Sequence, residues 1–286
     1  MSLTRRTALP YARQTLAIDL QQFRQERILR TRAPASELLE DIQVLRNPEA
    51  ATGRELARTG PLLPRLLMAL FAFLRRLLQA PLRLEARRYE LVAHLLKLLR
   101  VDIAPSEPLA LELDLRPDTH PAKLQGETQT RTSWKVKHYV DPWLSLQGRL
   151  LDGSHFRVEL TERVDDRTRW KTTARGKQKR KTKRVADAIA KVQLRVKPER
   201  YQHLDRLGPH ARNAVQLPPG TQLKNLGVEG DRITLAVRVN APWDFKDTER
   251  GRVNAVRLVA MMFLSLYQVL NLSRRLDKKA LPPSVG

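Results

Sequence analysis

The sequence predicts an α+β fold with N-terminal helices, a central antiparallel β-sheet that is sandwich-like or barrel-like, and an apolar C-terminal helix that packs back. Apolar residues recur with a helical period in the first hundred residues and again near the C-terminus, whereas between about 105 and 240 they alternate with polar residues. Asp152-Gly153 forms a tight-turn signal between two alternating stretches, and tight turns join antiparallel neighbours. We therefore expect a helical region at 1–104, an antiparallel β domain at 105–245, and a C-terminal helix with a tail at 246–286.

Three helices are expected in the N-terminal region. The first follows an apolar face that continues to about Leu29, and Pro34 ends that segment. The second begins at Ser36, a residue type that caps helix N-termini, and ends before Pro48. The third extends from about Leu84 to Arg100, and its wide apolar arc predicts a mostly buried helix.

Six alternating stretches are expected to be strands. Trp134 and Phe156 have the phase of their apolar neighbours, which predicts that both rings lie in the core. Pro117 ends the first strand, because proline cannot donate a hydrogen bond to a sheet. The predicted strands are Leu109–Leu115, Trp134–Val140, Leu144–Leu150, Phe156–Leu160, Ala190–Val196 and Ile233–Val239.

Two segments are apolar on nearly every side of a helix. Leu66–Leu74 is too short to span a bilayer, which takes about 20 residues. Val253–Leu272 is long enough, but Arg257 lies inside it, and a charged residue in a membrane span is costly. We expect both helices to be buried against each other or against the sheet, with insertion at a membrane surface as the alternative.

Composition indicates a strongly basic protein. The chain has 53 basic and 30 acidic residues, a formal net charge of +23, which favours nucleic acid, anionic lipid or an acidic protein as a partner. Solvated arginine on ordinary helix surfaces is the simpler explanation of the same charge. The absence of cysteine excludes disulfides, thiolate metal sites and cysteine nucleophiles. Residues 1–20 lack the apolar core of a signal peptide, so a cytoplasmic location is expected, with membrane association as the alternative.

No motif predicts catalysis. The six histidines are scattered without ligand spacing, and His138 is expected to be buried in strand phase. Gly176-Lys177 lacks the upstream glycine and the following Ser or Thr of a phosphate-binding loop. Asp165-Asp166 are most simply solvated turn residues at the end of a strand. We therefore expect no enzyme, no metal site and no cofactor.

The most basic part of the chain predicts a binding site. The run Arg175–Arg184 has seven cations in ten residues and no acid, and the wider segment 131–200 has 20 basic residues against 8 acidic ones. Because like charges repel in a compact state, we expect a basic loop at 167–184 that meets an anionic partner. Trp170 lies between basic neighbours near the start of this loop and is expected to be exposed. The predicted nucleic-acid-binding residues are Arg167, Arg169, Trp170, Lys171, Arg175, Lys177, Lys179, Arg180, Lys181, Lys183 and Arg184.

The predicted function is non-catalytic binding of nucleic acid, such as RNA, or of another polyanion. Cationic grooves with stacking aromatic rings are typical of proteins that bind single strands, and a cationic hairpin can also lie along a duplex groove. Phosphate contacts carry no sequence information, so low sequence specificity is expected. The alternatives are a solvated loop with no ligand, and a membrane-associated structural protein that uses its two apolar helices and their basic flanks.

Overall fold

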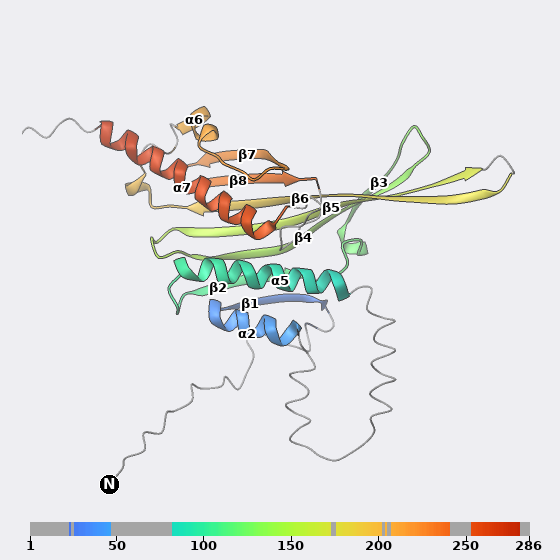
Figure 1. The fold of residues 1–286 in the computed structure, drawn as a ribbon, viewed down its shortest axis with the longest axis horizontal. Coiled ribbons are helices and arrows are strands. Elements are labelled where there is room, and N and C mark those ends of the chain that lie inside the picture. The colour runs from blue at the N-terminus through green and yellow to red at the C-terminus, as the bar shows by residue number, and fades with distance from the viewer. Residues whose placement is uncertain are drawn as a thin grey trace, which may run out of the picture.

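The chain forms one open antiparallel sheet of eight strands with helices packed on it (Figure 1). The computed structural model describes residues 23, 26–46, 82–172, 176–201, 204, 207–240 and 253–280. The strands are β1 (Ile28–Pro34), β2 (Pro108–Asp114), β3 (Leu124–Gln129), β4 (Lys135–Arg149), β5 (His155–Thr172), β6 (Gln178–Arg195), β7 (Thr221–Glu229) and β8 (Arg232–Val239). Their order is β1-β2-β4-β5-β6-β8-β7, with β3 paired to β4. The predicted α+β class is confirmed, with an open sheet rather than a sandwich or barrel.

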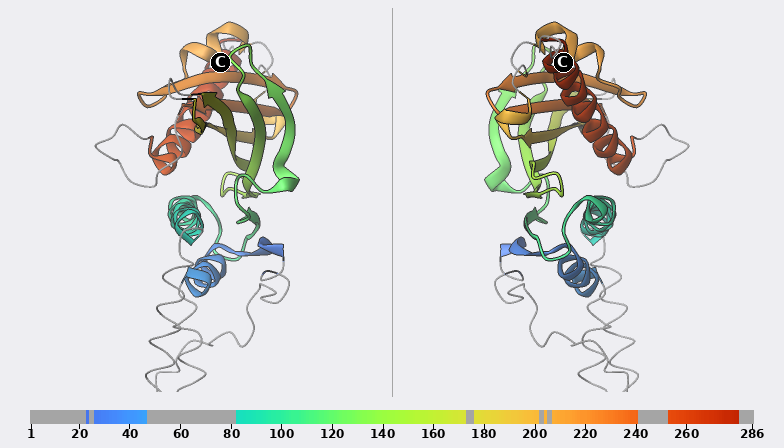
Figure 2. Two further views of the ribbon diagram at one scale, coloured as in Figure 1. Left: turned by 90° about the vertical axis from the view of Figure 1, so that its right-hand side faces the viewer. Right: turned by 90° about the vertical axis from the view of Figure 1, so that its left-hand side faces the viewer.

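The main helices cover one face of this sheet. They are α2 (Ala35–Arg46), α5 (Leu82–Leu99), the short α6 (Gly208–Asn213) and α7 (Ala255–Ala280). Figure 2 shows α5 and α7 on the same side of the sheet, while α2 contacts α5 and β1. The helices predicted from Ser36, from Leu84 and near the C-terminus are therefore present. The opposite side of the sheet, on which none of α2, α5 and α7 packs, is called the open face below.

The end of the first predicted helix is wrong. Phe23 and Glu26 are helical, but Arg27 has a positive φ of 52°, and Ile28 and Leu29 already belong to β1. β1 pairs antiparallel with β2 along its whole length. This strand has three polar or charged residues in succession, Arg30, Thr31 and Arg32, and it buries only Leu29 and Ala33, so its pattern does not alternate clearly.

Strand β4 joins two of the predicted strands through a β-bulge. The register with β5 shifts between Pro142 and Leu144, and a bulge changes which residues face each side of a sheet. Leu144 is buried with the core, whereas Trp134 points to the open face and is only partly buried. The prediction that Trp134 lies in the core is therefore wrong. The same prediction for Phe156 is confirmed, since only 2% of that side chain is exposed.

One hydrophobic core connects the helical region, the sheet and the C-terminal helix. It includes Leu38 of α2, Leu95 of α5, Val192 of β6 and Leu266 of α7, all of them fully buried. α7 lies against β6, β8 and α5. The chain therefore buries the apolar face of its C-terminal helix against the sheet, as the sequence predicted.

The membrane alternative depends on α7 and on Leu66–Leu74. Residues Ala255–Arg275 of α7 are long and apolar enough to cross a bilayer by length and composition, but half of their most apolar stretch is buried inside the protein. Core helices of folded proteins pass the same test of length and composition. Leu66–Leu74 lies outside the described residues, so its predicted packing against α7 stays a prediction.

A buried ionic cluster joins α5 to strands β4 and β5. Arg88 Nη2 lies 2.5 Å from Asp141 Oδ2 and 3.1 Å from Glu162 Oε2, and its guanidinium stacks 4.9 Å from the Trp143 ring. These side chains are almost completely buried. Burying a charge is costly unless it is paired, so each member of the cluster stabilises the buried state of the others.

A second cation completes this cluster. Lys123 Nζ lies 2.7 Å from Asp141 Oδ1 and 3.2 Å from Asp114 Oδ1, and it donates a hydrogen bond to the Arg116 carbonyl oxygen. Burial raises the pKa of Asp141, and Arg88 and Lys123 oppose that shift. One carboxylate therefore binds cations from α5 and from the segment between β2 and β3.

We predict that Arg88→Ala lowers the free energy of unfolding by about 3–5 kcal/mol, because the facing carboxylates Asp141 and Glu162 lose the cation that bridges them. Asp141 then retains Lys123, and Glu162 retains Arg87. Arg30→Ala is the matched control. Arg30 pairs with Glu112 at 2.9 Å, but the two side chains are 63% and 51% exposed. Exposed pairs contribute about 0–1 kcal/mol. Urea unfolding measures both variants, and equal losses would contradict this account of the cluster.

Candidate functional site

Strands β5 and β6 extend beyond the rest of the sheet as a two-stranded ribbon (Figure 1). β8 pairs with β6 only between Ala188 and Arg195, and β4 pairs with β5 only as far as Thr168. We call residues 165–172 of β5 and 178–185 of β6 the ribbon, of which 165–168 still pair with β4. The predicted loop at 167–184 is wrong over most of its length, because these residues are paired strands from Arg167↔Lys183 to Thr172↔Gln178. The backbone pairing fixes where the cations lie.

One face of the ribbon carries six cations in three directly opposed pairs. The pairs are Arg167↔Lys183, Arg169↔Lys181 and Lys171↔Lys179, and we call these residues the cation ladder. Alternate β5 residues such as Phe156 and Val158 are buried beneath the helices, so the ladder lies on the open face. Like charges directly opposite each other destabilise a sheet. In the free protein, the ladder therefore destabilises the strand pairing of the ribbon.

The ladder residues differ in their partners. Arg167 Nη2 lies 2.7 Å from Asp165 Oδ2, and the Arg169 guanidinium stacks on Trp134 at 4.5 Å from the ring centre. The four lysines are exposed, and no carboxylate of the described residues forms an ion pair with them. Their charge is thus available to a ligand. The four are Lys171, Lys179, Lys181 and Lys183.

The other face of the ribbon carries an exposed aromatic ring. Trp170 is directly opposite Arg180, and 68% of the Trp170 side chain is exposed, as the sequence predicted. Arg184 lies on this face nearer the sheet and forms an ion pair with Asp118. Arg184 therefore ties the ribbon to the segment after β2, a role that its place in the basic run did not reveal.

A further predicted site residue, Lys177, is exposed immediately before β6. Arg175 lies outside the described residues, so its predicted role stays a prediction. The structure thus brings the described members of the predicted site onto one hairpin, with two faces of different chemistry.

A chain of hydrogen bonds supports the base of the ladder. His138 Nδ1 lies 2.7 Å from Asp165 Oδ1, and His138 Nε2 lies 2.8 Å from Thr128 Oγ1. Hydroxyl, imidazole and carboxylate occur here in the order used in nucleophilic catalysis. Thr128 is exposed, and Asp165 also accepts a hydrogen bond from Arg167. These hydrogen bonds connect β3, β4 and β5 at the base of the ladder.

This arrangement corrects two sequence interpretations. His138 is partly exposed and hydrogen-bonded rather than buried, and Asp165 and Asp166 lie within β5 rather than in a turn. Partial burial would raise the pKa of Asp165, but hydrogen bonds from Arg167 and His138 outweigh it and lower the pKa. Asp165 therefore stays ionised at neutral pH and fixes the first cation of the ladder.

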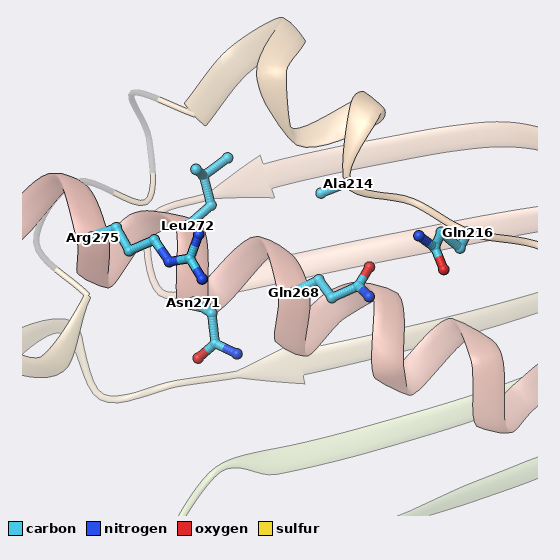
Figure 3. A pocket seen from close by; sticks show the side chains of 6 residues that line it. All are labelled: Ala214, Gln216, Gln268, Asn271, Leu272 and Arg275. Atoms are coloured by element: carbon cyan, nitrogen blue, oxygen red, sulfur yellow. The ribbon is translucent and has the colours of Figure 1, made fainter.

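A cavity of about 330 Å³ lies between α7 and the segment that follows α6. Figure 3 shows Gln268, Asn271 and Arg275 of α7 and Gln216 of the segment after α6 around it. It is remote from the ladder and has one charged residue. Among the described residues, no cluster of His, Asp and Glu could hold a metal ion.

Comparison with protein-family models, characterised proteins and solved structures finds no match to this chain.

We predict that Lys181→Glu stabilises the ribbon in the free protein, because the new carboxylate lies directly opposite Arg169. Opposed pairs of unlike charge contribute roughly 0.2–1 kcal/mol, which corresponds to amide exchange about 1.4- to 5-fold slower. Hydrogen exchange of β5 and β6 amides measures the effect.

Lys191→Glu is the control on the same strand and the same face. Lys191 lies opposite Glu159, so this substitution places like charges opposite each other and should speed exchange. A shift in the same direction for both variants would show that cross-strand charge does not control ribbon stability.

Proposed function

We propose that the protein binds nucleic acid, without acting on it chemically, through the cation ladder and Trp170. The single observation that supports this is the ladder itself, in which paired backbone holds three cation pairs against their mutual repulsion. Phosphate groups remove that repulsion, because each lysine or arginine gains an opposite charge. A polyanion therefore compensates the repulsion between the opposed cations of the free protein.

The dimensions of the ladder suit a phosphate backbone. Residues on one face of a strand repeat about every 6.8 Å, so three rungs cover about 14 Å along the ribbon. The cations project in two rows from the same face. Such a surface recognises the charge and spacing of phosphate groups rather than the identity of the bases, so the proposed binding has low sequence specificity.

Trp170 adds a stacking surface to these phosphate contacts. Its ring is exposed on the face opposite the ladder, next to Arg180. Exposed aromatic rings beside cations are typical of proteins that bind single strands, because an unpaired base has a free π-face. Single-stranded RNA or DNA is therefore the favoured ligand within this proposal.

The membrane-associated alternative has less support. Its main element, α7, has Leu258, Met262 and Leu266 completely buried in the protein core. The basic ribbon, in contrast, projects away from that core (Figure 1). An acidic lipid surface therefore remains a control ligand in the experiments rather than the proposed partner.

The first test removes three lysines from the ladder. Lys179→Ala, Lys181→Ala and Lys183→Ala together should weaken oligo(U) binding and flatten the slope of log K against log salt. The expected change is about 2 for a single strand, or about 2.7 for a duplex, if each lysine contacts one phosphate. Fluorescence anisotropy over a salt series measures it.

The matched control removes the same charge elsewhere. Lys97→Ala, Arg100→Ala and Arg212→Ala change three exposed cations of the helical parts. This variant should bind with nearly the parental slope. Equal slopes for the ladder variant and the parent would reject the proposed function, and tighter binding to anionic vesicles than to oligo(U) would favour the membrane alternative.

The second test concerns Trp170. Trp170→Ala should weaken single-strand binding by roughly 1–3 kcal/mol, the usual contribution of one stacked base, whereas Trp170→Phe should retain most of the affinity. Thermal stability should hardly change, because the ring is exposed. A large loss of thermal stability with unchanged affinity would mark Trp170 as a structural residue instead.

A further inference from the structure

The body of the sheet carries an excess of cations on the open face. Three carboxylates there each bind two cations instead of one. Asp187 binds Arg163 (2.6 Å) and Arg238 (2.5 Å), Glu159 binds Arg157 (2.7 Å) and Lys191 (3.1 Å), and Asp231 binds Arg195 (2.5 Å) and Arg232 (3.9 Å). We call these groups the three triplets. Each has two positive charges and one negative charge, so each retains a net charge of +1.

The triplets are continuous with the cation ladder. Arg157 and Arg163 alternate along β5 on the same face as Arg167 and Lys171, and Lys191 occupies that face of β6. From Arg157 to Lys171 the strand extends about 48 Å. The open face thus combines the ladder, where lysines lack a carboxylate partner among the described residues, with a sheet body that is partly neutralised.

Stability alone does not account for the second cation of each triplet. An exposed ion pair contributes about 0–1 kcal/mol, and one cation is sufficient to pair the carboxylate. The second cation adds repulsion between the two positive groups. It leaves each triplet with one uncompensated positive charge, on a guanidinium or ammonium group that the carboxylate holds in place.

Two of the triplet carboxylates, Asp187 and Asp231, remain charged at neutral pH. Partial burial would raise the pKa of Asp187, but Arg163 and Arg238 outweigh burial and lower it. The hydrogen bond from Arg195 lowers the pKa of Asp231. These acids therefore orient their cations throughout the neutral range instead of releasing them.

We propose that the three triplets form a second binding segment for the same nucleic acid, so that a strand held by the cation ladder continues over the open face of the sheet. This inference rests on the proposed function and specifies its ligand as a single strand longer than the ladder. The partner is defined by charge complementarity, because each triplet offers one net positive charge to a phosphate. The triplets alone bind too few phosphates to hold a short strand.

The triplets allow a variant that removes charge without leaving a carboxylate unpaired. Lys191→Ala, Arg232→Ala and Arg238→Ala together delete the second cation of each group. Arg157, Arg195 and Arg163 remain to pair the three acids. The variant should therefore melt close to the parental temperature, and Lys191→Ala alone serves if the triple variant is unstable.

The experiment compares oligo(U) of about 6 nucleotides, which is little longer than the ladder, with oligo(U) of about 30 nucleotides, which also reaches the triplets. For the long strand, the triplet variant should flatten the salt slope by about 2, or by about 0.7 for Lys191→Ala alone. For the short strand, its slope and affinity should match those of the parent. The Lys97, Arg100 and Arg212 variant should leave both strands unaffected.

The outcomes separate the two proposals. An unchanged slope for the long strand, or equal losses for both strands, would overturn the second binding segment while the ladder variant still tests the first. If the ladder variant binds both strands like the parent, the proposed function itself fails. Loss confined to the long strand in the triplet variant, with loss of both strands in the ladder variant, supports the extended segment.

Discussion

The buried pairing of Arg88 with Asp141 and Glu162 is the constraint on which the arrangement of this molecule depends. The two carboxylates lie directly opposite each other on β4 and β5, where they would repel if Arg88 did not bind both. Because Lys123 binds Asp141 from another segment, one cluster fixes α5, β4, β5 and the chain before β3 together. Its cost of desolvation is offset only when all of these elements are in place.

This cluster lies where the ribbon leaves the sheet, and it explains how an unfavourable hairpin is held. Glu162 precedes the ribbon by three residues, and the Arg184–Asp118 ion pair adds a second attachment on the helix-covered side. Like-charge repulsion between single cross-strand pairs is at most about 1 kcal/mol. A strand pair that is anchored in this way tolerates such repulsion, and the tip can present lysines that a free hairpin would disfavour.

The sequence predicts elements well where one face is buried and poorly where none is. β2, β5 and β8 alternate clearly because one face of each strand is buried in the core, whereas β1, β3 and β7 lie at the edges or off the main path of the sheet and bury few of their residues. The bulge at Pro142 reverses the face of Trp134, which no local pattern reveals. The basic run is evident as charge, but its strand pairing is not, because the exposed end of the hairpin buries neither face. The anchoring of Arg184 depends on Asp118, which lies 66 residues away.

The distribution of acids along β5 and β6 makes the positive charge of this surface increase toward the ribbon. Acidic residues on the two strands end at Asp166 and Asp187, and residues 167–186 contain none. Positive potential on the open face therefore rises from the partly neutralised triplets to the ladder. Long-range attraction is strongest where charge is uncompensated, so the proposed ligand would meet the ribbon first. The oriented cations of the sheet body would contact the ligand only after that encounter. At such short range, their fixed positions matter more than their smaller net charge.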